Sequence, residues 1–208
     1  CGSFPQSHIK VVPNGVDCDS LMELKGIADF KKVEPDHLHI GIVGRLEPVK
    51  RVDIFIDMAT LCIKSNLIGR PCTFHIIGDG SLRAPMQGRV DASAMNDSIK
   101  FHGHRSDMAA CIASLDAIVM CSDHEGTPMT VLEALYLGTP VIAHDVGGLH
   151  ELLHKSPEML VQCHEPFAYA KSLAAYLTGG FARPSLPPVY RADCNAASML
   201  DIYMQLVS

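Results

Sequence analysis

The feature that most constrains this sequence is a regular alternation of short apolar runs with longer segments of helical periodicity. Most of the apolar runs are nearly continuous, which is typical of parallel strands that are covered on both faces. The predicted strands are residues 9–12, 39–44, 73–78, 99–103, 117–122, 140–145 and 159–163. The pattern therefore predicts a parallel sheet of about six strands.

Helical periodicity fills the intervals between these runs. In residues 49–65 the apolar side chains recur at spacings of three and four, as one buried helix face requires. Comparable patterns cover residues 81–94, 106–114, 129–137, 147–154, 165–177 and 193–206. Alternating strands and helices imply right-handed crossovers and a Rossmann-like, doubly wound α/β fold with helices on both faces. Ligands of such sheets bind beyond the carboxyl ends of the strands.

Composition excludes several classes of protein. The net charge is −6 and no basic block is present, which argues against a nucleic-acid partner. No apolar stretch reaches the ~18 residues that a transmembrane helix needs. The eight cysteines include no CxxC pair and lie mostly in apolar runs, so we expect reduced, buried thiols and no zinc site.

The chain is expected to form a single domain over residues 1–208. Residues 1–7 lack the regions of a signal peptide, and the chain does not begin with methionine, so we interpret them as the remnant of an interdomain linker. Residues 178–188 contain several Gly and Pro residues and are interpreted as a surface connection to the last helix, 193–206.

Two cations follow the second predicted strand, in the sequence VGRLEPVKR. Gly44 ends the strand and lets a ligand approach the backbone, while Arg45 and Lys50 follow on the same loop. A guanidinium fork and an ammonium group at one sheet edge could bind a diphosphate. The alternative is that both cations are ordinary solvated surface charges.

The next strand ends in HIIGDGSL, where Gly78 and Gly80 flank Asp79. Many turns between strand and helix need such a glycine, so this signal alone is weak. The dinucleotide fingerprint GxGxxG is incomplete because Arg83 stands at its last position, which counts against a nicotinamide-dependent dehydrogenase.

The richest segment is residues 121–153. Glu125 follows a strand, the turn Gly126–Thr127–Pro128 leads into a helix, and Glu133 lies about one turn further on. The unpaired N–H groups of Met129 and Thr130 would form an anion site at the helix start. Glu133 could accept two hydrogen bonds from a ribose diol. Alternatively, both acids are helix-start carboxylates without a ligand.

Five motifs occur in one order and together resemble the C-terminal domain of the retaining GT-B glycosyltransferases of family 4. They are PNGVD (13–17), VGRLEPVK (43–50), IIGDG (76–80), EGTPMTVLE (125–133) and LGTPVIAHDVGGLHEL (137–152). The resemblance covers about residues 8–154, with weaker support beyond.

The resemblance implies a role for each matching position. Arg45 and Lys50 correspond to the pair that binds the donor diphosphate and stabilises the leaving group, and Glu133 to the acid that holds the ribose hydroxyls. Glu125 corresponds to the acid near the donor sugar. The backbone from Gly126 through Thr127, Pro128 and Met129 to Thr130 corresponds to the loop around sugar and phosphate. Gly78 and residues 102–105, with His102 and Gly103, correspond to regions that line the nucleotide base, and Gly44 is a further candidate substrate-binding residue.

The sequence departs from the family at Gly126–Thr127–Pro128, where Gly-Phe-Gly or Gly-Leu-Pro is commoner, so the donor sugar stays open. His124 is interpreted as a loop histidine rather than a catalytic group. The DCD triplet at 17–19 matches a metal-binding pattern, but Asp19 is interpreted as a helix N-cap. No metal and no cofactor are expected, because Arg45 and Lys50 would replace the metal.

The resemblance implies that the full enzyme transfers a hexosyl group, with retention, from a UDP- or GDP-linked sugar to a glycan or lipid acceptor. The acceptor would bind an N-terminal domain that this chain lacks, so we expect the fragment alone to be inactive. We expect a cytoplasmic protein, and many relatives work at the inner face of a membrane. Alternatives are an epimerase, a phosphorylase or a non-catalytic domain of the same fold, and the base stays open among uridine, guanosine and adenosine.

Overall fold

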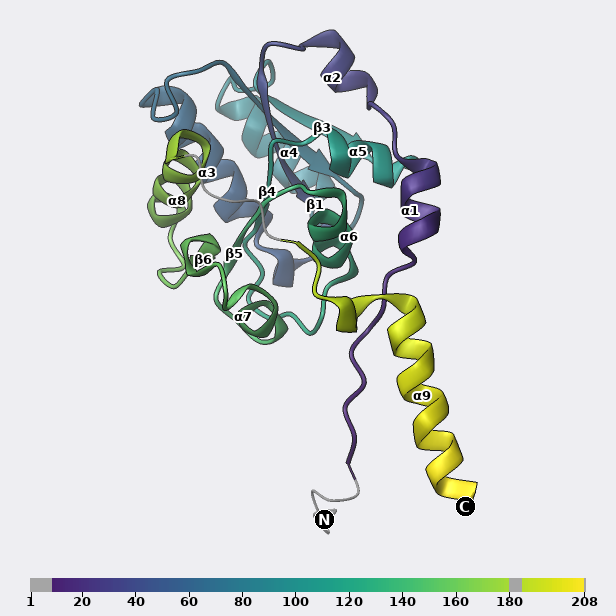
Figure 1. Cartoon of the computed structure of the whole chain (residues 1–208). Coiled ribbons are helices and arrows are strands. Elements are labelled where there is room, and N and C mark those ends of the chain that lie inside the picture. Colours follow the sequence, from purple (N-terminus) through teal and green to yellow (C-terminus); the bar gives the residue numbers. More distant parts are fainter. Residues whose placement is uncertain (1–8, 180–184, 208) are drawn as a thin grey trace.

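One parallel sheet forms the centre of the molecule. The computed structural model describes residues 9–179 and 185–207, and its six strands lie in the order β3-β2-β1-β4-β5-β6 (Figure 1). The strands are β1 (Leu38–Val43), β2 (Cys72–Ile77), β3 (Ile99–Gly103), β4 (Ala117–Met120), β5 (Val141–His144) and β6 (Leu160–Val161). All neighbouring pairs are parallel. The doubly wound, Rossmann-like α/β fold predicted from the sequence is confirmed.

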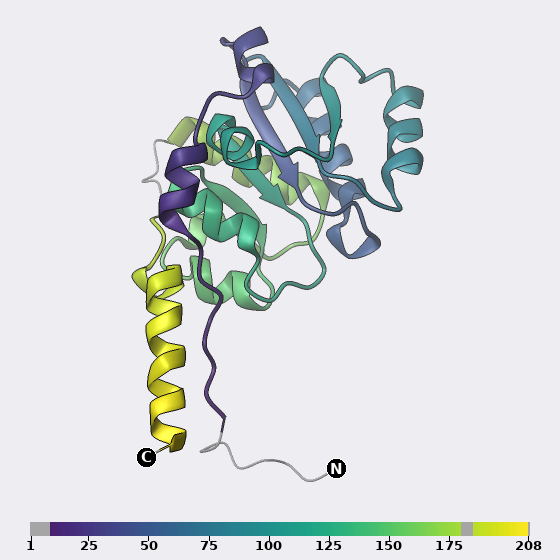
Figure 2. The same cartoon turned by 90° about the vertical axis from the view of Figure 1, so that its right-hand side faces the viewer.

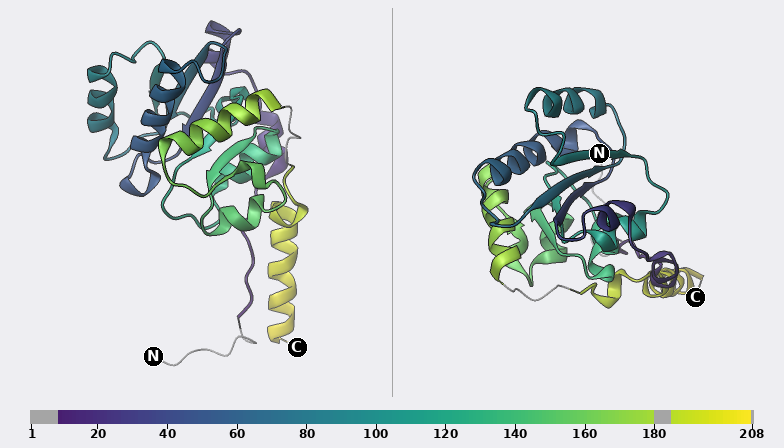
Figure 3. Two further views of the ribbon diagram at one scale, coloured as in Figure 1. Left: turned by 90° about the vertical axis from the view of Figure 1, so that its left-hand side faces the viewer. Right: turned by 90° about the horizontal axis from the view of Figure 1, so that it is seen from above.

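Helices cover both faces of the sheet. They are α1 (Cys18–Leu24), α2 (Asp29–Val33), α3 (Val52–Lys64), α4 (Arg83–Ala92), α5 (Met108–Ser114), α6 (Met129–Leu137), α7 (Gly148–Leu153), α8 (Pro166–Gly179) and α9 (Ala192–Val207). Short 3-10 turns are η2 (Pro48–Lys50), η3 (Pro157–Met159) and η4 (Pro188–Tyr190). Helices α3, α4 and α8 lie on one face and α1, α5 and α6 on the other, as the view from above shows (Figure 3).

The core lies between these layers. All residues of β1 are buried, which explains why its sequence is apolar on both faces. Ile40 and Phe74 of neighbouring strands have no exposed surface, and Phe55 of α3 packs edge-on against Phe74 with 6.1 Å between ring centroids. Burial of such side chains is the main stabilising contribution to this fold.

The strand order reverses between β1 and β4. The chain runs outward from β1 to β2 and β3, then returns to β4 on the other side of β1. Such a switch point opens a crevice at the carboxyl ends of the two strands, where ligands of doubly wound sheets bind. The loops that follow β1 and β4 carry Lys50 and Glu125, so the topology brings the two sequence motifs together.

Two predicted details are wrong, and one helix was missed. Residues 9–12 form no strand, because Ile9 and Val11 are 57% and 87% exposed and no strand of the sheet lies beside them. Asp17, not Asp19, caps α1, since its carboxylate accepts the N–H groups of Asp19 and Ser20 at 3.1 Å. Helix α2 was not predicted.

The expected linker remnant, residues 1–7, lies outside the described residues, as does part of the connection at 178–188. Among the described residues, Val16 forms backbone hydrogen bonds with residues at the start of α9. Its N–H donates to Tyr190 and its carbonyl accepts from Ala192, both at 2.9 Å. The two ends of the described chain therefore lie side by side.

Helix α9 extends away from the sheet beside the N-terminal segment, as Figures 1 and 2 show. Lys10 Nζ donates to Gln205 Oε1 at 2.7 Å and links the two segments. Apolar side chains on α9 stay open to solvent, with Leu200 61% and Met204 61% exposed. In the ranges that the structure describes, no helix has both the length and the apolar character needed to cross a bilayer.

Candidate functional site

Glycines bring the carboxyl ends of β1, β2 and β3 into contact. Gly44 and Gly78 have φ values of +145° and +138°, a region that favours glycine. A Cβ atom at Gly78 would overlap the carbonyl oxygen of Gly44. The N–H of Gly44 donates to Ile77 at 3.0 Å, and that of Gly78 donates to Gly103 at 2.8 Å. The edge is therefore a tight backbone surface on which a planar ligand could lie.

The two predicted cations follow β1 on this edge. Arg45 is exposed, and its side chain makes no hydrogen bond or ion pair with any described residue. Lys50 ends η2, and its Nζ lies 2.5 Å from Oε1 of Glu125, with side chains only 22% and 10% exposed. Arg45 is thus free to bind an anion, while Lys50 is held by a carboxylate from the loop after β4.

The loop that carries Glu125 is fixed from both sides. Toward β1, the N–H of Asp123 donates to the carbonyl of Val49 at 2.9 Å. Toward β5, the N–H of Gly148 donates to the carbonyl of Glu125 at 3.2 Å. A Cβ atom at Gly147 would overlap the same carbonyl oxygen, so only glycine permits this approach. The GG pair of the motif at 137–152 therefore packs against the Glu125 loop.

Helix α6 begins at the site with unpaired amides. Pro128 is its N-cap and offers no side-chain acceptor, while its carbonyl accepts from Val131 and Leu132 at 3.0 and 3.3 Å. The N–H groups of Met129 and Thr130 have no acceptor among the described residues. These donors, at the positive end of the helix, could hydrogen-bond an anion.

Glu133 lies one turn into α6 and is half-buried. Burial raises the pKa of its carboxyl group. The carboxylate makes no hydrogen bond or ion pair with any other residue in the described part of the chain. An acid that is desolvated and unpaired is available to a ligand with hydroxyl donors.

The side chain of His102 does not project freely from the edge. Its Nε2 lies 2.8 Å from Nδ1 of His75, and Nε2 of His75 lies 2.8 Å from Nδ1 of His39. These three residues, the histidine row, stack on the sheet beside Phe30. Nε2 of His102 is therefore occupied by His75, and the base-lining role of residues 102–105 stays a prediction.

The remaining residues that the sequence analysis singled out are His124, Thr127 and the aspartates of the DCD triplet. His124 is exposed and carries no recorded partner among the described residues, as a loop histidine would. Thr127 contributes its carbonyl to Asn14 Nδ2 at 3.4 Å, a contact that joins the PNGVD motif to the site. The carboxylate of Asp17 is used as the α1 cap. No cluster of three or more His, Cys, Asp or Glu side chains suited to a metal occurs in the described ranges.

Sequence reasoning missed one group of polar residues beside the site. Arg51 forms ion pairs with both Asp53 and Asp123, and Asp123 also contacts His164 at 3.1 Å. Asp123 and His164 each follow a predicted strand end, whereas Arg51 and Asp53 fall in the helix predicted over 49–65, and nothing in the sequence pairs positions 51 and 123. The left-handed backbone of Arg51, with φ 48° and ψ 50°, has no sequence signal because arginine rarely adopts it.

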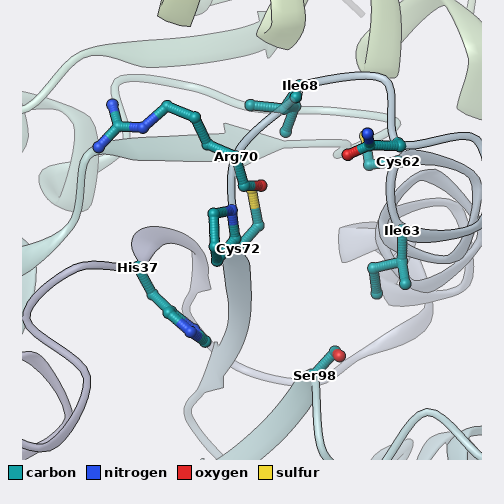
Figure 4. Close-up of a pocket in the computed structure, with 10 residues that line it drawn as sticks. His37, Cys62, Ile63, Ile68, Arg70, Cys72 and Ser98 are labelled. Atoms are coloured by element: carbon teal, nitrogen blue, oxygen red, sulfur yellow. The ribbon is translucent and has the colours of Figure 1, made fainter.

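A separate pocket of about 410 Å³ lies at the opposite edge, near the amino ends of β1, β2 and β3. Figure 4 shows His37, Arg70 and Cys72 on one side of it and Cys62 and Ile63 on the other. Ligands of doubly wound sheets bind at the carboxyl edge, so this pocket is not the candidate site.

The carboxyl edge therefore carries two cations, helix-start amides without an acceptor among the described residues, and an unpaired acid on a doubly wound sheet. They lie where ligands of doubly wound α/β sheets bind. The chain belongs to the family described as glycosyl transferases group 1, whose profile matches residues 37–178.

Individual relatives agree with this assignment. A D-inositol 3-phosphate glycosyltransferase from Jonesia denitrificans is 32% identical over 179 residues, which cover 79% of this chain and 42% of the relative. A 2-deoxystreptamine glucosyltransferase from Streptomyces kanamyceticus is 31% identical over 174 residues, covering 74% of this chain and 41% of the relative. This chain thus spans less than half the length of these relatives.

Solved structures share the fold. The Anabaena protein HepE, in complex with UDP and glucose, superposes with a TM-score of 0.72 at 20% identity. The similarity covers 96% of this chain and 56% of HepE.

Proposed function

We propose that this chain is the donor-binding domain of a retaining glycosyltransferase of family 4, the C-terminal half of a GT-B enzyme. One observation carries the proposal. Two cations, the free start of α6 and the unpaired carboxylate of Glu133 are presented by one edge of the sheet. Each group alone would be ordinary, but together they match the parts of a nucleoside diphosphate.

The proposed ligand is a UDP- or GDP-linked sugar. Arg45, Lys50 and the amides of Met129 and Thr130 would bind the diphosphate, and Glu133 would accept hydrogen bonds from the ribose hydroxyls. Binding of UDP and glucose by HepE supports this choice of ligand. The two cations carry the charge that a metal ion would otherwise supply, so the proposal includes no metal.

The proposed reaction breaks the bond between the sugar's anomeric carbon and the diphosphate oxygen, and forms a bond from the same face to the oxygen of an acceptor hydroxyl. The proton of that hydroxyl passes to the departing diphosphate oxygen. Negative charge grows on the departing diphosphate. Lys50, Arg45 and the α6 amides would stabilise that charge, an effect worth about 3 kcal/mol for each well-placed donor. Glu125 would orient Lys50 and accept a hydrogen bond from a hydroxyl of the donor sugar.

The acceptor, a glycan or lipid, would bind a second domain. The relatives are more than twice as long as the matched region, which leaves room for one. The apolar side chains that α9 exposes, including Leu200, Tyr203, Met204 and Leu206, would suit contact with that domain. Without it, this chain would bind donor but turn over poorly. We propose a cytoplasmic enzyme that works at the inner face of a membrane.

Calorimetric titration with UDP, GDP and ADP in the presence of EDTA tests the proposal. We expect one diphosphate to bind saturably without metal. Arg45→Ala and Glu133→Ala should each weaken binding at least tenfold, because a hydrogen bond to a charged group contributes about 1.5–3 kcal/mol. Arg70→Ala, which removes an exposed arginine at the opposite edge, is the matched control and should bind as the parent does.

Two results would contradict the proposal. Absence of binding by all three diphosphates would exclude a donor-binding domain. Equal weakening by Arg70→Ala and Arg45→Ala would show that binding depends on overall charge rather than on the proposed site. An absolute requirement for a divalent cation would reject only the metal-free mechanism.

A further inference from the structure

Arg51, next to Lys50, has a left-handed backbone conformation and a side chain that forms two ion pairs. It is the C-cap of η2 and also the N-cap of α3, and its φ of 48° and ψ of 50° lie in the left-handed region that favours glycine. A non-glycine residue persists there only when its surroundings hold it. The conformation turns the chain sharply between Lys50 and the first residue of α3.

The guanidinium group holds two carboxylates. Toward α3, Arg51 Nε and Nη2 contact the two oxygens of Asp53 at 3.1 and 2.9 Å, a bidentate pair. Across the switch point, Nη1 contacts Oδ1 of Asp123 at 3.3 Å. The side chains are about one-third exposed, with 34% for Arg51 and Asp53 and 41% for Asp123. Arg51 thus ties the loop after β1 to the loop after β4.

Asp123 is itself held in place. Nε2 of His164 lies 3.1 Å from Oδ1 of Asp123, and Nδ1 of His164 lies 2.8 Å from the hydroxyl of Tyr169. The ring of His164 stacks on His144 with 3.9 Å between centroids. Burial lowers the pKa of His164, so the neutral ring donates from Nε2 to Asp123 and accepts from the hydroxyl of Tyr169.

The two loops that Arg51 joins are those that carry the ion pair. Lys50 precedes Arg51 directly, and Glu125 follows Asp123 by two residues. A lysine has a flexible four-carbon side chain, so the direction of its ammonium depends on its backbone and on its partner. Without the link from Arg51 to Asp123, both ends of the Lys50–Glu125 pair would lose a fixed support.

We propose that Arg51 is a positioning residue that, through Asp53 and Asp123, holds the Lys50 ammonium where the donor diphosphate binds. The inference rests on the proposed function and adds a residue to it. Arg51 itself does not touch the ligand in this account. Its effect should therefore appear only through Lys50 and only with ligands whose terminal phosphate Lys50 contacts.

The test compares UDP with UMP, and GDP with GMP, in calorimetric titrations. Arg51→Gly keeps the left-handed backbone without strain and removes the guanidinium. We expect it to weaken diphosphate binding about five- to tenfold, while monophosphate binding changes less than about twofold. In a Lys50→Ala background the same substitution should change diphosphate binding less than about twofold, because the residue that it positions is gone.

Two further variants separate this effect from general damage. Asp123→Asn breaks the link from the other loop and should give the same preferential loss of diphosphate affinity. Arg89→Ala removes an exposed Arg–Asp pair between α4 and α3 and should leave both affinities unchanged.

Unchanged diphosphate binding by Arg51→Gly would overturn the inference, as would an equal loss for monophosphate and diphosphate or an undiminished effect in the Lys50→Ala background. In these cases the parent protein still binds and the proposed function stands. If the parent protein binds none of the nucleotides, the proposed function fails, and this inference fails with it.

Discussion

The ammonium nitrogen of Lys50 lies 2.5 Å from carboxylate oxygen Oε1 of Glu125, and this pair joins the loops that follow β1 and β4. These strands are neighbours at the switch point of the sheet. Both side chains are largely shielded from solvent, so their interaction is stronger than that of a surface pair. Glu125 therefore neutralises the cation when no diphosphate is bound, and a diphosphate must compete with it.

Glu125→Gln should change the affinity for the free diphosphate and the additional affinity for the nucleotide sugar in opposite directions. The neutral amide no longer neutralises Lys50, so we expect UDP or GDP to bind about two- to fivefold more tightly. The additional affinity of the nucleotide sugar over the free diphosphate should fall, because the carboxylate acceptor for the sugar hydroxyl is lost. Competition titrations with both ligands measure the two effects. Weaker binding of the free diphosphate would contradict this role for Glu125.

Glu133→Gln should weaken nucleotide binding without harming the fold. The carboxylate is half-buried and unpaired, and burial raises its pKa, so ionised Glu133 opposes folding slightly at neutral pH. We expect the free energy of unfolding at pH 7.5 to stay equal or to rise by up to about 1 kcal/mol. Binding of the nucleotide should fall about tenfold. Urea denaturation and calorimetry on the same sample check both effects, and a clear loss of stability would refute the ligand role.

The histidine row should make stability depend on pH. Nε2 of His39 lies 2.8 Å from the carbonyl oxygen of Glu34 and must donate to it, so every Nε2 of the row donates, while Nδ1 of His39 and Nδ1 of His75 accept. Burial lowers the pKa of His39, His75 and His102, that of His75 to about 2. If His39 or His75 were protonated, its Nδ1–H would point at the Nε2–H of the next ring. The unfolded chain takes up these protons near pH 6.5 and the folded protein does not, so stability falls as pH drops below 6.5.

From pH 7.5 to 5.5 we expect a loss of about 1.4 kcal/mol from His75 alone, with further loss from its neighbours. Urea denaturation at several pH values measures it. His75→Phe should reduce the loss by that amount whatever its stability at pH 7.5. His154→Asn, at an exposed position, is the control and should keep the parent slope. A pH-independent free energy of unfolding would contradict the neutral row.

Substitution by alanine should lower the stability of the protein at Gly78 and raise it at Gly88. Gly78→Ala places a Cβ atom against the carbonyl of Gly44 at a φ of +138°, so we expect a loss of at least about 2 kcal/mol. Gly88 lies in α4 with open space around its Cβ position, and alanine there should stabilise by about 0.5–1 kcal/mol. Thermal unfolding of both variants checks the contrast. A tolerated Gly78→Ala would mean that β1 and β2 do not approach so closely.

Much of the fold could be predicted from the sequence because its strands are buried on both faces. Continuous apolar runs identified β1 to β6, and the helix over 129–137 agrees with α6. Residues 9–12 show the limit, since β-branched residues form a strand only beside a partner, and this segment has none in the sheet. Helix α2 has only five residues, too few for a periodic signal.

The places of Lys50, Glu125 and Glu133 at the carboxyl edge were predictable, because one motif carries each group and follows or overlaps a strand end. Contacts between distant segments were not. Arg51 and Asp123 are separated by 72 positions, and their pairing follows from the strand order rather than from any local pattern. The histidine row likewise depends on which face of each strand points toward Phe30.

The most direct test of the central claim is a map of backbone amide shifts on titration with UDP and GDP in EDTA. The account expects the largest changes at Gly78, Met129 and Thr130, because the ligand binds at the carboxyl edge beside α6. Amides of Gly69 and Ser98, which line the pocket at the opposite edge, should not move. Changes confined to Gly69 and Ser98, or no saturable change anywhere, would contradict the donor-binding site.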